Sequence, residues 1–329
     1  MKLASIEQIK SVVHHPNADL LDVVTCLGFQ AIVKRNQFEV GQLVVFIQPD
    51  VVLPDVQWAS FYKAKSNRVK AIRLRQVWSM GIVESLSILG NVPQDIDAIT
   101  DAQEGYEVSG MLGITKFEPP QPQDLNAKGH LPHGLNKTDE ERFNNILDLP
   151  YGEIVDVTLK IDGQSLTTYF KNDDFGITTR SMDLKLDSTN NYTNVVKQFG
   201  ILDKLTSFCR KHKVNLAFRG ESYGKGIQAF KGNPHSIKPL GFALFNVLDL
   251  DTLKYAGTES PFYFEKVGNE LGIEIVPILE KGVVLTPELI QKYERDLDKI
   301  NSEFFEGVVV KLKNGDSFKV INFHFDSKK

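Results

Sequence analysis

Short stretches of alternating apolar and polar residues follow one another along the first part of the chain, up to about residue 115. Their β-branched and aromatic residues predict strands, and the prolines, glycines and aspartates between them predict turns. The expected strands include residues 23–26, 30–33, 43–47 and 69–78. Several short strands in so small a region favour a closed β-barrel, and an OB-like barrel is among the options.

The pattern changes after this region. Residues 118–134 are rich in proline, glycine and polar side chains, which is typical of a linker or loop. We therefore predict an amino-terminal domain over residues 1–115, a linker region over 116–149 and a second domain over 150–329. Within the linker region, residues 139–147 are expected to form a short helix.

The remainder of the chain mixes strands with two amphipathic helices. The first is expected at about residues 192–213, and the second at about 287–300, where Thr286 can cap the first turn. The fold class is therefore expected to be α+β, with an OB-like barrel followed by a domain of antiparallel sheets flanked by helices.

Composition excludes several classes of protein. The 329 residues suffice for two domains, and neither the hydrophobic content of 42% nor the charged content of 24% departs from that of a globular protein. No apolar run approaches the ~20 residues that span a bilayer, and the amino terminus lacks an apolar signal core. We expect a cytoplasmic or otherwise intracellular protein that is not secreted, with neither a membrane nor a protein partner.

Charge, cysteine and histidine content bear on disulfides, metal sites and nucleic-acid binding. Cys26 and Cys209 lie far apart and fit reduced thiols, and the seven histidines form no metal-type cluster. The net charge of −4 argues against a protein that coats nucleic acid without specificity, although it leaves room for a local basic surface.

The first candidate catalytic residues lie in Lys160-Ile161-Asp162-Gly163, between two strand-like segments. A lysine at the mouth of a strand pair, with an acid two residues later on the same strand face, is a candidate covalent nucleophile. The four-residue string is common by chance, and it gains weight from the segments that follow it in order. Those segments centre on Arg180, Glu221, Phe245, the pair Glu306 and Lys311, and Lys319.

This ordered set resembles motifs I, Ia, III, IIIa, IV and V of the covalent nucleotidyltransferase superfamily of ligases and capping enzymes, and most closely its RNA ligases. The resemblance covers roughly residues 150 to 325, and the segment from Gly220 to Gln228 is similar to the RNA ligase 2 branch. A barrel in front of such a domain resembles the fifth RNA ligase family, the Deinococcus–Naegleria type, in which an OB domain precedes the nucleotidyltransferase domain.

The resemblance implies an ATP-dependent RNA ligase. Lys160 would attack the α-phosphate of ATP to give lysyl-AMP, AMP would pass to a 5′-phosphate, and an RNA 3′-OH would be joined to it. The implied partner is a nicked duplex of RNA or of RNA and DNA. Asp162 and Glu306 would hold Mg²⁺ or Mn²⁺ mainly through water, because magnesium keeps several of its waters.

The resemblance also implies roles in binding ATP. An aromatic face stacks on adenine, carboxylates accept hydrogen bonds from ribose hydroxyls, and lysines neutralise the α-phosphate as charge develops. The residues implied are Phe245 for the stack, Glu221 and Ser165 for the ribose, Arg180 for sugar or phosphate, Lys311 and Lys319 for the phosphate, and the backbone around Thr158 and Leu159 for the base edge.

The chain departs from the family pattern in motif V. Many relatives have two lysines there, separated by one residue, whereas this sequence has Ile321 at the second place. Either Lys319 alone suffices, or Lys313 contributes from the preceding turn.

Two alternative functions share part of the pattern. DNA ligases and capping enzymes also contain Lys-x-Asp-Gly, but they normally carry an OB domain after motif V, and only ten residues follow Lys319 here. This favours an RNA ligase with its accessory domain in front over an ATP-dependent DNA ligase. A degenerate ligase that acts only as an RNA-binding module is the other alternative, against which the complete motif set argues.

A basic stretch marks the front domain. The run from Lys63 to Arg75 contains six basic residues and no acid, with aromatic residues on both sides. Basic residues interleaved with aromatics suit a track for phosphates with stacked bases, and a solvated outer strand face is the alternative. The predicted nucleic-acid contacts are Lys70, Arg73 and Arg75, and strand alternation would put the two arginines on one face.

Overall fold

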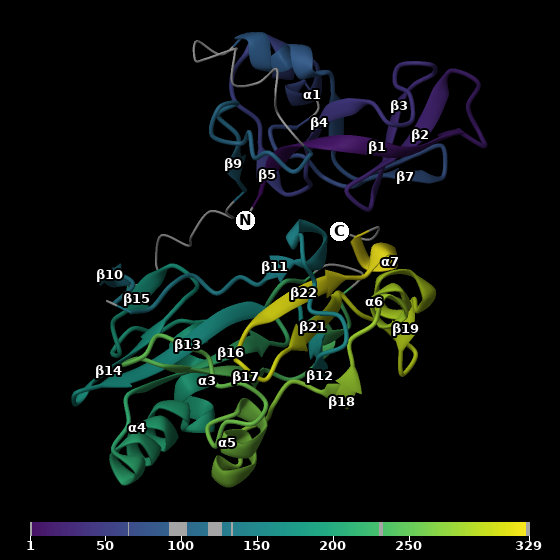
Figure 1. The fold of residues 1–329 in the computed structure, drawn as a ribbon. Helices are drawn as coiled ribbons and strands as arrows, with labels where there is room; N and C mark the ends of the chain where they lie inside the picture. The colour runs from purple at the N-terminus through teal and green to yellow at the C-terminus, as the bar shows by residue number, and fades with distance from the viewer. Residues whose placement is uncertain are drawn as a thin grey trace. The chain divides into compact units, whose positions relative to one another are not determined.

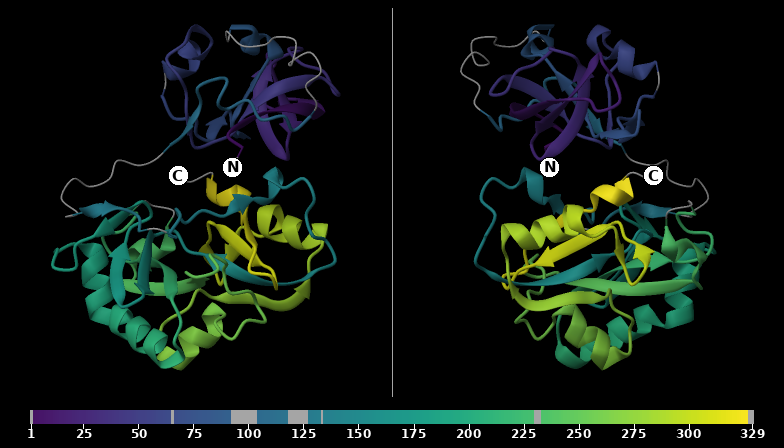
Figure 2. Two further views of the ribbon diagram at one scale, coloured as in Figure 1. Left: turned by 60° about the vertical axis from the view of Figure 1, so that its left-hand side comes forward. Right: turned by 90° about the vertical axis from the view of Figure 1, so that its right-hand side faces the viewer.

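The chain forms two compact units, Met1–Pro120 and Gln121–Lys329 (Figures 1 and 2). This division falls within the stretch whose composition predicted a linker. The computed structural model describes residues 2–64, 66–91, 104–117, 127–132, 134–229 and 233–326.

The first unit is built on a five-stranded antiparallel sheet of order β3-β2-β1-β4-β8. The amino-terminal half of β1 pairs with β4 and its carboxy-terminal half with β2, with a register shift between Ile9 and Ser11. Such a shift bends a strand, so that β1 takes part in both halves of a barrel-like sheet. The strands are β1 Ala4–His14, β2 Leu21–Cys26, β3 Phe29–Lys34, β4 Leu43–Ile47 and β8 Ile82–Glu84.

Smaller elements complete this unit. Two further antiparallel pairs are β5 Val51–Val52 with the distant β9 Thr115–Lys116, and the hairpin of β6 Ile72–Leu74 with β7 Val77–Ser79. The helical turns are Gln57–Ala59, α1 Ser60–Lys63 and Leu86–Asn91. Three predicted strands are confirmed within β2, β3 and β4. The fourth, residues 69–78, is instead a tight hairpin, because Arg75 and Gln76 take left-handed backbone conformations with φ of 45° and 72°.

The second unit contains two larger sheets. The six-stranded sheet has the order β10-β15-β14-β13-β16-β17, and the five-stranded sheet has the order β11-β22-β21-β12-β18. The strands of the first are β10 Ala127–His130, β13 Gln164–Lys171, β14 Asp174–Thr178, β15 Met182–Leu184, β16 Leu216–Tyr223 and β17 Gly241–Asp249. Those of the second are β11 Glu141–Arg142, β12 Ile154–Lys160, β18 Ile278–Val284, β21 Gly307–Lys311 and β22 Ser317–Ile321.

Three helices lie on one side of the six-stranded sheet: α3 Asn191–Phe199, α4 Ile201–His212 and α5 Phe264–Leu271 (Figure 1). Their apolar residues pack into one core with the sheet, including the fully buried Leu205 and Phe218. The single helix predicted for residues 192–213 is therefore two helices. They divide at Gly200, whose φ of 61° ends the first helix in the left-handed conformation.

The helix predicted for residues 287–300 is also shorter than expected. Thr286 caps it as predicted, but α6 Pro287–Gln291 passes into one π-helical turn, Lys292–Asp296, and the chain then forms a hairpin. The Asn322 side chain donates to the carbonyls of Tyr293 and Leu297, and so satisfies backbone groups at the end of this helix. The hairpin strands are β19 Lys299–Ile300 and β20 Glu303–Phe304, and α7 Phe323–Asp326 follows β22.

Residues 139–147 do not form the predicted helix. Glu141–Arg142 is β11, which pairs in parallel with β22, and a 3₁₀ turn follows at Phe143–Asn145. The backbone of this segment pairs with the open edge of β22, so its hydrogen-bonding groups are satisfied without a helix. Much of the predicted linker region thus belongs to the second unit, while residues 118–126 and 133 of the predicted loop lie outside the described residues.

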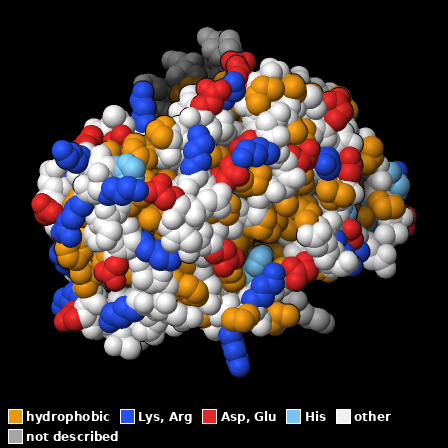
Figure 3. Space-filling model, turned by 90° about the horizontal axis from the view of Figure 1, so that it is seen from below, with side chains coloured by type: hydrophobic (Ala, Val, Ile, Leu, Met, Phe, Trp, Pro, Cys, Tyr) orange, Lys and Arg blue, Asp and Glu red, His pale blue; other side chains and the backbone are white. Residues whose placement is uncertain are grey.

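One face of the second unit shows acidic and basic side chains intermixed rather than gathered by sign (Figure 3). Ion pairs in this unit include Lys211 with Glu270 and Lys281 with Glu265. In the described part of the chain no helix is long and apolar enough to cross a membrane.

Candidate active site

Strand register gathers the three lysines that the sequence singled out. On β12 and β21, Lys160 lies opposite Gly307 and Asp156 lies opposite Lys311; on β21 and β22, Val309 lies opposite Lys319. Residues directly opposite each other share a face, and the face alternates along each strand. Lys160, Lys311 and Lys319 therefore all project from the same face of the five-stranded sheet.

Lys160, the last residue of β12, is paired with an acid. Its Nζ donates to Glu306 Oε2 at 2.7 Å, and Glu306 directly precedes β21. Burial opposes a charge on this amine, but the carboxylate of Glu306 and those of two further acids outweigh it and raise the pKa of Lys160. The further acids are Glu221 and Asp162.

Glu221 stands on β16, opposite Ser165 of β13. Its Oε1 accepts a hydrogen bond from the Gly163 amide at 3.1 Å. Burial raises the pKa of Glu221 to about 8, against the nearby charge of Lys160. Three carboxyl groups thus gather around one amine, and a divalent cation beside them would favour their ionised forms.

The turn after Lys160 is held by its neighbours. A side chain at Gly163 would collide with the carbonyl oxygen of Ser222, so the turn requires glycine there. The Asn233 side chain donates to the Asp162 carbonyl at 2.9 Å and accepts from the His235 amide. Asn233 is buried, and it thereby fixes the backbone of the residue predicted to approach the metal.

Lys311 is deeply buried. Its ammonium lies 5.2 Å from the centre of the Phe264 ring. Burial lowers the pKa of Lys311 to about 8, although Glu140 and Asp156 favour its charged form. Its amine therefore loses its proton more easily than an exposed lysine would.

Lys319 and Arg180 share one acceptor. Asp139 accepts from Lys319 Nζ at 2.8 Å through Oδ1 and from Arg180 at 3.1 Å through Oδ2. Burial, Arg142 and Lys160 together lower the pKa of Lys319 to about 8. Arg180 follows β14 of the six-stranded sheet and Lys319 belongs to β22, so Asp139 links the two sheets.

Other predicted residues contact the same segment of chain. Ser165 forms a hydrogen bond with Thr138, and the buried Arg219 donates to the Asn136 carbonyl at 2.9 Å. Arg219 also donates to the hydroxyl of Tyr255. The segment before β12 is consequently anchored to the six-stranded sheet at several points.

Phe245 is aimed by a β-bulge. On β16 and β17, Gly220 pairs with Leu244 and Arg219 with Asn246, so Phe245 is the extra residue between them. Bulges re-aim side chains and are frequent beside active sites. Phe245 is half-buried and lines a cavity, whereas Phe242 of the same strand is 2% exposed and belongs to the core.

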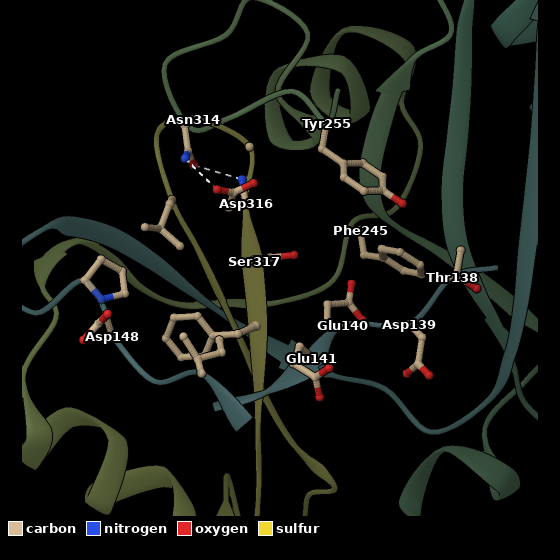
Figure 4. A pocket seen from close by; sticks show the side chains of 15 residues that line it. Thr138, Asp139, Glu140, Glu141, Asp148, Phe245, Tyr255, Asn314, Asp316 and Ser317 are labelled. Carbon is tan, nitrogen blue, oxygen red and sulfur yellow. Dashed lines mark hydrogen bonds between the residues drawn. The ribbon is translucent and has the colours of Figure 1, made fainter. Parts of the chain in front are cut away.

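This cavity has a volume of about 530 Å³. Phe245 and Tyr255 stand near each other on one wall, and the β21–β22 turn with Asp316 and Ser317 stands opposite (Figure 4). The remaining lining residues are Thr138, Asp139, Glu140, Glu141, Ile146, Asp148, Pro150, Leu312, Asn314, Gly315 and Phe318. An aromatic wall beside the lysine-bearing sheet can accept a flat, polar ligand.

The remaining predicted contacts are more constrained. The Thr158 hydroxyl is buried and donates to the Val309 carbonyl, and the Leu159 amide donates to the Pro277 carbonyl at 2.8 Å. The contact of backbone groups there with the edge of the base stays a prediction. The Leu159 amide already donates to a carbonyl of the protein. Lys313 Nζ lies 2.8 Å from Glu259, and Lys313 is not among the residues that line the cavity, although its neighbours Leu312 and Asn314 are.

The predicted nucleic-acid residues lie at the β6–β7 hairpin of the first unit. The Arg73 guanidinium lies 5.7 Å from the Trp78 ring centre, Arg75 donates to the Asn17 carbonyl, and Lys70 is exposed. Arg75 occupies the turn rather than the strand. The expectation that strand alternation pairs the two arginines on one face is therefore wrong, because alternation ends at Leu74.

The sequence did not indicate the roles of Asp139, Thr138 and Asn233. The first two lie in the segment interpreted as linker and helix, where acids followed by apolar residues mimic a helix start. The Asn233-Pro234 dipeptide did indicate a turn, but its contact with Asp162 spans 71 positions of sequence and depends on the fold.

Comparisons with known proteins agree with these features. The family model described as RNA ligase matches residues 153–321, and an OB-fold domain model matches residues 3–86. No curated protein matches the chain.

Solved structures of Naegleria gruberi RNA ligase resemble the whole chain. A lysine-to-methionine variant with AMP and Mn has a TM-score of 0.80 at 25% identity, covering 99% of this chain and 98% of that one. An arginine-to-alanine variant with ATP and Mn has 0.80 at 25%, covering 98% and 97%. A lysine-to-alanine variant in its apo form has 0.81 at 26%, covering 99% and 98%. The predicted OB-like barrel and the ligase-type second domain are confirmed.

Proposed function

The chain belongs to the RNA ligase family, and from that premise we propose that it is an ATP-dependent polynucleotide ligase that joins an RNA 3′-OH to a 5′-phosphate, at nicks in duplexes of RNA or of RNA and DNA. The observation that carries this proposal is the face shared by Lys160, Lys311 and Lys319, beside an aromatic-walled cavity. An intracellular, cytoplasmic location fits it, since the reaction consumes ATP and both cysteines are free thiols.

In the first step, Lys160 Nζ attacks the α-phosphorus of ATP. The N–P bond forms as the bond from phosphorus to the bridging oxygen breaks, and pyrophosphate leaves with the electron pair. Because the structure favours the ammonium form of Lys160, the proton must leave first, and Glu306 Oε2 at 2.7 Å is the nearest acceptor. Lys311 and Lys319 would neutralise charge that builds on the phosphate.

In the second step an oxygen of the 5′-phosphate attacks the phosphorus of lysyl-AMP, the P–N bond breaks, and Lys160 leaves as an amine that regains its proton. In the third step the RNA 3′-OH loses its proton and attacks the adenylylated 5′-phosphate, and AMP leaves with the electron pair of the broken P–O bond. Phe245 would hold the adenine by stacking, which tolerates any base. Glu221 and Ser165 would contact the ribose, and Arg180 the sugar or phosphate. Ser165 and Glu221 lie opposite each other on β13 and β16, and Arg180 follows β14 of the same sheet.

The carboxylates around Lys160 fit a divalent cation. The raised pKa of Glu221 reflects burial and the repulsion of Glu306 and Asp162, so a nearby positive charge would stabilise its ionised form. No three acid, histidine or cysteine side chains among the described residues converge to hold an ion by themselves, which leaves water and phosphate oxygens as further ligands. Bound Mg²⁺ or Mn²⁺ would supply charge that favours the neutral amine and stabilises the phosphate. The Mn in the Naegleria structures supports this assignment.

Label transfer from α-³²P-ATP tests the first step. The unmodified protein should become labelled in the presence of Mg²⁺ or Mn²⁺, and Lys160→Ala should not, because no other amine would take its place. GTP should label poorly if the pocket selects adenine.

Lys211→Ala is the matched control, since this lysine pairs with Glu270 on the surface and should label normally. Undiminished labelling of Lys160→Ala would exclude Lys160 as the nucleophile. A folded unmodified protein that takes no label but binds RNA would favour the RNA-binding module instead.

A further inference from the structure

A short segment in front of β12 crosses from one sheet of the second unit to the other. We call residues 136–142 the strap. At one end its Asn136 carbonyl and Thr138 hydroxyl bond to Arg219 and Ser165 of the six-stranded sheet. At the other end it pairs with β22 of the five-stranded sheet as β11.

Asp139 lies in the middle of the strap and contacts a cation from each sheet. One carboxylate oxygen accepts from Lys319 and the other from Arg180, so both oxygens are used. The Asp139 side chain is 26% exposed and that of Lys319 is 11% exposed, and Asp139 also lines the cavity.

Resting on the proposed function, we propose that Asp139 is a positioning residue for adenylylation, which holds Lys319 and Arg180 at the places from which they contact the nucleotide. The two cations stand on different sheets and are joined through this one carboxylate. Misplacement of a transition-state contact by about 1 Å can cost roughly 10²-fold in rate.

The charge of Asp139 has a second effect. Lys319 is faced by Arg142 on β11, Lys160 on β12, Glu140 on the strap and Glu306 before β21, and burial with the two cations lowers its pKa. A carboxylate 2.8 Å away favours the protonated amine. Its removal therefore lowers the pKa of Lys319 further, and the amine loses its proton at a lower pH.

The test is the pH dependence of label transfer from α-³²P-ATP by Asp139→Asn and Asp139→Glu, with the full chain. For Asp139→Asn we expect kcat to fall roughly ten- to a hundredfold while KM for ATP changes little, and the alkaline limb of the profile to move to lower pH. Asp139→Glu, which keeps the charge, should return the alkaline limb to its original position and recover part of kcat.

Asp173→Asn is the matched control, because Asp173 also pairs with an arginine, Arg210, on the outer turn between β13 and β14. Its left-handed φ of 64° suits asparagine. This variant should match the unmodified protein in rate and profile.

An Asp139→Asn protein with unchanged kcat and profile would overturn the proposal. So would an Asp139→Glu protein whose alkaline limb lies at lower pH than that of the unmodified protein, and this second criterion applies even if Asp139→Asn fails to fold. Absence of label in the unmodified protein would instead reject the proposed function, so the two failures are distinguishable.

Discussion

At the residue scale, nearby charge and burial shift the pKa values of the lysines of the candidate site in opposite directions. The carboxylates around Lys160 raise its pKa, whereas burial lowers the pKa of both Lys311 and Lys319 to about 8. The proposed nucleophile is thus the lysine held in its charged form, whereas the two proposed phosphate ligands have pKa values close to neutral pH. In the proposed reaction, ATP and a metal must therefore change the electrostatics before Lys160 can attack.

Phe245 offers the sharpest test at this scale. Phe245→Leu keeps most of the apolar volume but removes the stacking face, so ATP affinity should fall while stability drops by less than about 1.5 kcal/mol. Nucleotide binding by calorimetry and thermal unfolding measure the two effects separately.

Phe242→Leu is the matched control on the same strand. Because Phe242 is 2% exposed in the core, this change should cost more stability and leave ATP affinity of the folded protein intact. The stacking role is refuted if Phe245→Leu binds ATP normally and only its stability declines.

At the element scale, two turns hold the cavity walls together. Gly315, between β21 and β22, approaches Tyr255 so closely that a side chain there would collide with the Tyr255 carbonyl oxygen. Gly257 approaches the Lys313 carbonyl in the same way. Tyr255 follows β17 of the six-stranded sheet and forms a bridge with Leu248, so this contact joins the two sheets at the rim of the cavity.

We predict that Gly315→Ala lowers stability and also raises KM for ATP, because the walls must separate to admit the methyl group. Gly152→Ala is its control. Both glycines have positive φ, 94° and 92°, but a side chain at Gly152 meets nothing within 4 Å. Gly152→Ala should lower stability only by the cost of the backbone strain, of the order of 1 kcal/mol, and should leave KM unchanged. Equal effects of the two changes on stability and KM would show that the close contact does not set the width of the cavity.

At the scale of the whole molecule, each unit has its own core. One cluster unites the amino-terminal strands around Ile6 and Val45, and separate clusters support the sheets of the second unit. The residues of the candidate nucleotide site all belong to the second unit, whereas the exposed Lys70 and the Arg73–Trp78 contact belong to the first. The units can therefore serve different steps of one reaction.

We predict that removal of residues 1–115 spares much of the lysyl-AMP formation but severely reduces nick sealing, since only sealing needs the duplex held in register. The measurement compares label transfer with the joining of nicked duplexes that differ only in RNA or DNA at each side of the break. Sealing by the full chain should require RNA at the 3′-OH and weaken with salt as phosphate contacts are lost. A truncated protein that seals as well as the full chain would assign the barrel another role, and efficient sealing of all-DNA nicks would favour a DNA ligase.

The sequence by itself determined the order and type of the chemical groups. Alternating apolar residues predicted strands β2, β3 and β4, and the ordered lysines, acids and Phe245 predicted the family and hence the fold. These features are local, because a strand pattern and a motif depend on neighbours within a few positions. For the same reason the sequence predicted a helix at 139–147 that does not form, because the segment pairs with β22. It also misplaced the helix ends at 192–213 and 287–300, which depend on the conformation of Gly200 and on the hydrogen bonds of the Asn322 side chain.

Only the tertiary structure decided which distant groups meet. Strand register put Lys160, Lys311 and Lys319 on one face, and a bulge turned Phe245 toward the cavity. The contact of Asp139 with Lys319 joins residues 180 positions apart, and it arises because the strap finds hydrogen-bond partners at the edge of β22. Register, bulges and edge pairing depend on backbone groups that every residue carries, so side-chain pattern alone does not specify them.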